Sequence, residues 1–231
     1  MPRSRREKIL DITRTEIKET ARHLMREKGT AGLSIRAIAR NMEMTAPALY
    51  HYYPSLNELI TALIEDAFTR LAKSLEAAVT DESLKTPAER LTAVATANRR
   101  WALTHPIDFQ LIYGNPIPGY EQPVEITYPP ARRSFVVTAK IFAEAIQNGE
   151  INLSAEYGNL PEAITQSLQE LSQIEDHNLP LPALYLAAVA WAKFHGHIML
   201  ELFNLIQPVI GNVDAFFDYE IEQFLRYVGL N

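Results

Sequence analysis

Basic, aromatic and hydroxyl side chains gather in residues 33–59, LSIRAIARNMEMTAPALYHYYPSLNEL. Ser34 is placed to cap a first short helix, in which Ile35 and Ile38 return at helical spacing. Arg36 and Arg40 fall on the opposite side of this helix. Guanidinium groups donate paired hydrogen bonds to phosphates, so this segment combines a face that packs with a face suited to nucleic acid.

A second short helix follows after a four-residue turn. Thr45 is placed to cap it, and Pro47 falls in its first turn, where a missing N–H costs little. Leu49 and Tyr53 point toward a core, which leaves six outward positions: Ala46, Pro47, Ala48, Tyr50, His51 and Tyr52. Two short helices with this spacing predict a helix-turn-helix that enters a DNA groove.

The segment resembles the N-terminal domain of the tetracycline-repressor (TetR) family of bacterial transcription regulators. The matching positions are Gly29, Leu33, Ser34, Arg36, Ile38, Ala39, Leu49, Tyr50, Leu59 and, with Tyr for Phe, Tyr53. The chain departs from the pattern twice: Glu43 replaces the usual turn glycine, and Leu56 replaces a lysine that often meets phosphate. A left-handed Glu43 would cost about 1 kcal/mol, which a packed domain tolerates.

The resemblance implies roles for individual residues. Arg36 is expected to contact guanine, whereas Ala46, Pro47 and Ala48 are expected to meet thymine methyls or sugar edges. Phosphate contacts are expected from Thr45, Tyr50, His51 and Tyr52. Arg3, Arg5 and Arg6 are expected to trail along the backbone or a minor groove.

Charge is divided unevenly along the 231 residues. Residues 1–54 carry 11 Lys/Arg and 6 Asp/Glu, a net charge of +5, whereas the rest carries 11 and 22, a net of −11. A basic N-terminal part beside an acidic remainder suits DNA binding. The alternative is that the charges lie on an ordinary solvated surface and are unevenly distributed by chance. The chain has no cysteine and its start has no apolar signal-peptide core, so we expect a cytoplasmic protein without disulfides or membrane insertion.

Helical signals fill the remaining sequence and predict an all-α fold of about nine or ten helices. Residues 1–54 are predicted to form the helix-turn-helix DNA-binding domain and residues 55–231 a helical regulatory and dimerisation domain. The expected helices cover residues 13–28 (opened by a Thr13/Glu16 capping box, or starting earlier near Arg5), 34–42, 46–53, a long helix from 55, one from 87, a short segment near 109–113, 132–148, 162–176, 182–207 and 213–228. Proline and glycine predict loops over residues 114–130 and 150–161.

The second half also resembles a TetR-family body, a variant named for a Trp-His-Gly signature, here Trp191, His195 and Gly196. Such a body implies a pocket for a small apolar or aromatic effector. The residues expected to line it are Trp101, Phe109, Tyr113, Phe135, Trp191 and His195, with plain core packing as the alternative.

Motifs of catalysis are absent from the sequence: no Gly-x-Ser-x-Gly, phosphate-cradling glycine loop or His-Glu-x-x-His occurs. We therefore expect no enzyme, no cofactor and no metal site. The favoured function is a ligand-responsive homodimeric repressor on a near-palindromic double-stranded DNA operator, dimerising through residues 182–207 and 213–228. The alternative is an all-α homodimeric module or enzyme with an unused helix-turn-helix.

Overall fold

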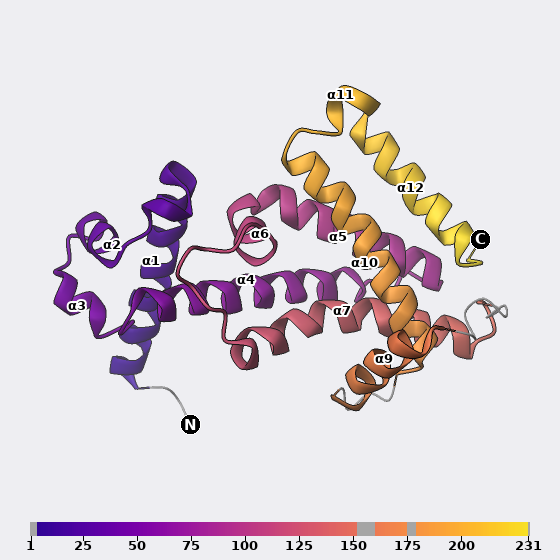
Figure 1. The fold of residues 1–231 in the computed structure, drawn as a ribbon, viewed down its shortest axis with the longest axis horizontal. Helices are drawn as coiled ribbons and strands as arrows, with labels where there is room; N and C mark the ends of the chain where they lie inside the picture. The colour runs from indigo at the N-terminus through magenta and orange to yellow at the C-terminus, as the bar shows by residue number, and fades with distance from the viewer. Residues whose placement is uncertain (1–3, 152–159, 175–178, 231) are drawn as a thin grey trace. The chain divides into compact units, whose positions relative to one another are not determined.

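The computed structural model describes residues 4–151, 160–174 and 179–230, and every regular element in those ranges is a helix (Figure 1). The predicted all-α class is therefore confirmed, with eleven α-helices and one 3-10 turn in the described ranges. The chain divides into two compact units. The first holds Met1–Thr69 and His105–Pro130, and the second holds Arg70–Thr104 and Ala131–Asn231.

The first helix, α1, spans Arg5–Lys28, so the earlier of the two predicted starts is correct. Ser4 Oγ accepts a hydrogen bond from the Glu7 backbone N–H at 3.2 Å, and Glu7 Oε2 accepts one from the Ser4 N–H at 2.7 Å. This reciprocal capping box satisfies two donors at the helix start. The predicted capping box at Thr13 is wrong, because its hydroxyl instead donates to the Ile9 carbonyl inside the helix.

The first unit also contains η1 (Thr30–Gly32), α2 (Ile35–Asn41), α3 (Ala46–Tyr50), the first part of α4 (Leu56–Ala78), α6 (Pro106–Tyr113) and the start of α7 (Val124–Gln147), up to Pro130. Their core contains the fully buried Ile17, Leu24, Ile38, Leu49 and Phe109. The Phe109 ring lies 5.0 Å from that of Tyr113. The short helix predicted near 109–113 is thus present, and it packs with the N-terminal helices.

Helix α7 spans Val124–Gln147, so the predicted loop over residues 114–130 is too long. The helix begins where the Pro123 carbonyl accepts from the N–H groups of Ile126 and Thr127, each at 3.1 Å. Pro129 and Pro130 then sit inside the helix, although each lacks the donor that reaches back four residues. The Thr127 side chain is fully buried and accepts from Gln122 Nε2 at 2.7 Å, which secures this turn.

The second unit is built from α5 (Pro87–Thr104), the remainder of α4 and α7, α9 (Glu162–Ile174), α10 (Leu181–Leu202), α11 (Gln207–Ile210) and α12 (Val213–Tyr227). Phe142, Leu184, Leu186 and Phe217 are fully buried in its core. Most of the predicted irregular stretch at 150–161 lies outside the described residues.

Helix α10 ends at Leu202 rather than continuing to Gln207, because the chain turns at Asn204, whose φ is +57°. The Leu205 N–H then bonds to the Leu200 carbonyl at 2.8 Å, which closes the helix end. In the described ranges, no helix combines the length and apolar character that crossing a membrane would need.

Candidate nucleic-acid interface

The helix-turn-helix is formed by α2 and α3, which lie beside α1 (Figure 1). Ser34 caps α2 as predicted, accepting from the Ala37 N–H at 3.1 Å. Ile35 and Ile38 are buried, whereas Arg36 and Arg40 are exposed. The α2 helix therefore anchors one face and presents its guanidinium groups on the other.

The turn between the two helices is a hydrogen-bonded Schellman motif around Glu43. The Met44 N–H bonds to the Ala39 carbonyl at 2.8 Å, and the Glu43 N–H bonds to the Arg40 carbonyl at 3.3 Å. Glu43 adopts the left-handed conformation, with φ of +55°. The conformation considered in the sequence analysis is thus observed, and it costs about 1 kcal/mol because the position favours glycine.

Helix α3 has five residues; Thr45 caps its start, and buried side chains anchor its end. Thr45 accepts from the Ala48 N–H at 3.3 Å, and Leu49 and Tyr53 are buried. The helix ends at Tyr50, so the predicted extent through residue 53 is too long, and Tyr53 anchors the chain from beyond the helix. Tyr50 is 48% exposed.

The other predicted contact residues in this segment are open to solvent to differing degrees. Thr45, Pro47 and His51 are exposed, whereas Ala46, Ala48 and Tyr52 are half-buried. All of them, with Tyr50, belong to α3 or its immediate flanks, next to a turn that Glu43 closes. The segment thus presents hydroxyl, imidazole and small apolar groups together, which suits contacts to phosphates, sugars and thymine methyls.

The N-terminal arginines adopt a helical rather than an extended conformation. Arg5 and Arg6 form the first turn of α1 and are exposed, whereas Arg3 lies outside the described residues. Arg14, which the sequence analysis did not single out, is a further arginine of α1, and its charge acts on Tyr53. Burial raises the pKa of the Tyr53 phenol, and the nearby positive charge of Arg14 opposes that rise. No local pattern signals this proximity, because the two residues are far apart in the chain.

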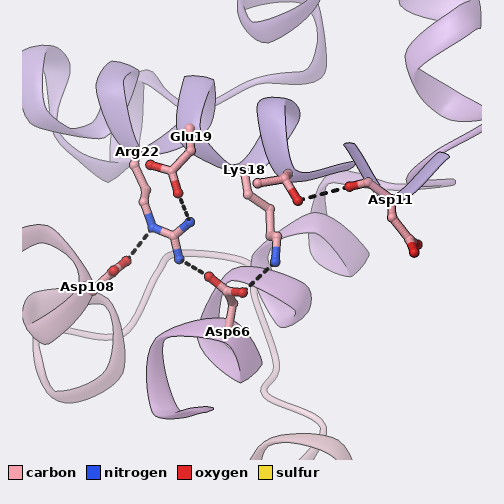
Figure 2. Close-up of polar contacts among 7 residues, drawn as sticks. Asp11, Lys18, Glu19, Arg22, Asp66 and Asp108 are labelled. Atoms are coloured by element: carbon pink, nitrogen blue, oxygen red, sulfur yellow. Dashed lines mark hydrogen bonds and ion pairs between the residues drawn. The ribbon is translucent and has the colours of Figure 1, made fainter. Parts of the chain in front are cut away.

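Behind the helix-turn-helix, a group of charged side chains connects three helices of the first unit (Figure 2). We call Lys18, Glu19, Arg22, Asp66 and Asp108 the Arg22 cluster. Arg22 Nε donates to Asp108 Oδ1 at 2.6 Å, Nη2 to Asp66 Oδ2 at 2.7 Å and Nη1 to Glu19 Oε1 at 3.0 Å. Lys18 Nζ donates to Asp66 Oδ1 at 2.6 Å.

Two members of the Arg22 cluster, Arg22 and Asp66, have shifted pKa values. Burial acts to lower the pKa of Arg22, but Asp108 and Asp66 outweigh burial and raise that pKa. Burial likewise acts to raise the pKa of Asp66, yet the bonds from Lys18 and Arg22 lower it below the ordinary value. Both shifts favour the charged forms of Arg22 and Asp66.

The residues predicted to line an effector pocket are divided between the two units. Phe109 and Tyr113 lie in α6 of the first unit. In the second unit, Trp101 is buried and Phe135 is half-buried.

The last two predicted pocket residues neighbour each other on α10. Trp191 is 50% exposed, and its ring lies 5.7 Å from that of His195. Burial lowers the pKa of His195. No three His, Cys, Asp or Glu side chains gather as a metal site among the residues that the structure describes.

Comparison with known proteins finds two family patterns along the chain. The sequence pattern described as bacterial regulatory proteins, tetR family, matches residues 17–63, and that of the tetracyclin repressor-like C-terminal domain matches residues 91–224. The HTH-type transcriptional regulator Rv1816 of Mycobacterium tuberculosis is 33% identical over 189 residues, which are 82% of this chain and 80% of that protein.

Solved structures agree with these sequence matches. The crystal structure of SCO4313 is 32% identical, has a TM-score of 0.78 and covers 98% of this chain and 100% of its own. A protein of unknown function from Rhodococcus sp. RHA1 is 25% identical with a TM-score of 0.71, covering 94% and 95% of the two chains. The likeness therefore extends over both units.

Proposed function

The chain belongs to the TetR family of DNA-binding transcription regulators, and from this premise we propose that it is a homodimeric repressor released from its operator by a small effector. Family membership also decides against the alternative of an enzyme with an unused helix-turn-helix. The observation that carries the DNA-reading proposal is the exposed face of α2 and α3 over a fully buried Leu49. Recognition of a DNA groove requires hydrogen-bond donors that are held in place, and the buried Leu49 fixes the helix that carries them.

Within this face, we assign base reading to Arg36 and backbone contacts to the α3 flank. Arg36 is exposed on α2, and a guanidinium is the side chain that pairs bidentately with guanine. Tyr50 and Thr45 carry hydroxyl groups suited to phosphates. Ala46, Pro47 and Ala48 offer only apolar contact, whereas His51, Tyr52, Arg5 and Arg6 add donors around them. The net charge of +5 on residues 1–54 supports this assignment.

The assignment is tested by selecting bound duplexes from a random pool and then comparing two variants on the selected and a scrambled duplex. Arg36→Ala is expected to lose about 1–3 kcal/mol on the selected duplex and much less on the scrambled one. Tyr50→Phe removes a phosphate donor and is expected to weaken both duplexes alike. Equal loss on both duplexes for Arg36→Ala would refute the base-reading role.

We place the effector in the second unit, among Trp101, Phe135, Trp191 and His195, while Phe109 and Tyr113 remain candidates within α6. Support comes from the aromatic content of this part and from buried polar atoms. Among the described residues, Asn98 Oδ1, Gln223 Nε2 and His197 Nδ1 are buried without a hydrogen-bond partner. Such atoms favour an effector that carries polar groups on an apolar or aromatic frame.

The effector proposal predicts reciprocal coupling between ligand and DNA. A ligand that lowers operator affinity by coupling of about 1–3 kcal/mol must itself bind less tightly, by the same factor, when operator is present. Compounds from a library of apolar and aromatic molecules are titrated into the protein with and without the selected duplex. A bound compound with equal affinity in both titrations is not an inducer, and a library with no binder contradicts the sensing role.

A further inference from the structure

The turn between α2 and α3 exposes a carboxylate beside the helix to which DNA contacts are assigned above. Glu43, Thr45 and Pro47 are open to solvent. Met44 and Ala46, which alternate with them along the chain, are half-buried. The turn lies on the side of α2 and α3 that faces away from α1 (Figure 1). Glu43 is therefore exposed together with the start of α3.

The backbone of this turn is fixed on both sides of Glu43. Its own N–H donates to the Arg40 carbonyl at 3.3 Å, and the N–H of Met44 donates to the Ala39 carbonyl at 2.8 Å. Directly after the turn, Thr45 caps α3, and Leu49 anchors that helix in the core. A side chain that reads a base must extend from a backbone held in this way.

Glu43 carries two costs that a glycine in the same turn would avoid. Its positive φ of +55° strains any residue with a Cβ. It is also the single acidic residue of residues 33–57, where phosphates repel a carboxylate. Strained residues cluster at functional sites. Both costs are explained if the side chain makes a contact with DNA that glycine cannot make.

The chemistry of a carboxylate selects the base that it can contact. A carboxylate accepts hydrogen bonds and donates none. In the major groove, guanine and thymine present acceptors to it, and adenine places its N7 acceptor beside its amino group. Cytosine presents the N4 amino donor alone, and acidic side chains accept from this group. Cytosine is therefore the base that suits Glu43.

We propose that Glu43 is a specificity-determining residue, which accepts a hydrogen bond from cytosine N4 in each half-site of the operator. The proposal rests on the DNA-reading function proposed above and adds a second base to the guanine assigned to Arg36. Repulsion by phosphates weakens binding to every duplex, whereas the cytosine contact strengthens binding to the operator alone. The same side chain thus rejects other sequences and selects its own.

The test selects duplexes from a random pool in parallel with the full-length wild type and with Glu43→Gln. Glutamine keeps the size of the side chain and the strain of the turn, but it replaces one acceptor oxygen by a donor. The wild type is expected to select a cytosine at one position of each half-site. Glu43→Gln is expected to select adenine or no fixed base there, because an amide pairs with adenine N6 and N7. The guanine assigned to Arg36 should remain in both selections.

Titrations then measure the affinity for the duplex that the wild type selects and for a copy in which this C·G pair is replaced by T·A. The wild type is expected to bind the altered duplex roughly tenfold more weakly, whereas Glu43→Gln should bind both with equal affinity. Glu58→Gln is the matched control. It removes an exposed acidic side chain from the first turn of α4 in the same unit and should keep the tenfold discrimination.

Two results would overturn the role of Glu43 while leaving the DNA-reading function intact. The first is an unchanged cytosine preference in Glu43→Gln. The second is tighter binding of Glu43→Gln to every duplex with no change in base preference, which would show that Glu43 acts by repulsion alone. A wild type that selects no duplex would instead refute the DNA-reading function, and the role of Glu43 with it.

Discussion

Glu43 occupies a position where the backbone favours glycine, and its conformation has a measurable cost. Glu43→Gly is expected to raise the free energy of unfolding by about 1 kcal/mol relative to Glu43→Ala, because only glycine adopts positive φ without strain. Both variants remove the same negative charge, so both should bind the selected duplex equally well. Urea unfolding measures the difference, and equal stability of the two variants would show that the turn is not strained.

Among the helices of the second unit, Arg99 is the link that joins α5 to α10 and α12. Its guanidinium donates to both Glu201 oxygens at 2.7 Å and to Asp214 Oδ1 at 2.5 Å, and it lies 5.0 Å from the Phe217 ring centre. The hydrogen bonds with Glu201 have the largest effect on the pKa of Arg99 and raise it, although burial acts to lower it. The partner carboxylate of Glu201 is only 11% exposed, which makes this pair costly to break.

Arg99→Met is therefore expected to lower the free energy of unfolding by about 3 kcal/mol, since it leaves Glu201 largely buried without its cation. The same substitution at Arg133, whose pair with Glu76 is exposed, should cost less than about 1 kcal/mol. Urea unfolding of both variants gives the comparison. Similar losses would mean that the Arg99 contacts do not stabilise the packing of these helices.

At the scale of the whole molecule, the proposed homodimer depends on apolar surface carried by α10, α11, α12 and the turn that joins α10 to α11. The exposed large side chains there are Trp191, Leu200, Phe203, Leu205, Val209, Ile210, Tyr219 and Tyr227. A Cβ at Gly196 would meet no atom of another described element within 4 Å, so the glycine leaves room on the helix surface. Exposed apolar residues in this number are typical of an interface.

We expect wild-type protein at micromolar concentration to scatter light as a dimer and Gly196→Leu to shift it toward the monomer. Leucine favours a helix by about 1 kcal/mol over glycine, and its Cβ has open space around it among the described residues, so helical content should persist in circular dichroism. Two-fold symmetry further predicts selected duplexes with near-palindromic half-sites about one helical turn, or a multiple, apart. A monomeric wild type would contradict both expectations.

Sequence alone determined the local parts of this protein. Ser34 and Thr45 cap helices whose first donors are three residues away, Glu43 closes a turn within one motif, and helical spacing marks the buried Ile38 and Leu49. These features depend on neighbours in the chain, so a pattern of residue types is sufficient to predict them. The matched family pattern added the function and the expected roles of Arg36 and Tyr50.

Tertiary structure alone decided which distant residues meet. Arg22 and Asp108 stand 86 positions apart, and each by itself reads as an ordinary surface charge until α6 packs against α1 and buries both. The packing of α6 also placed Phe109 with the N-terminal helices, and the packing of α1 near the end of the helix-turn-helix brought the charge of Arg14 close to Tyr53. Such pairings depend on the burial and geometry of the folded chain, which local periodicity does not encode.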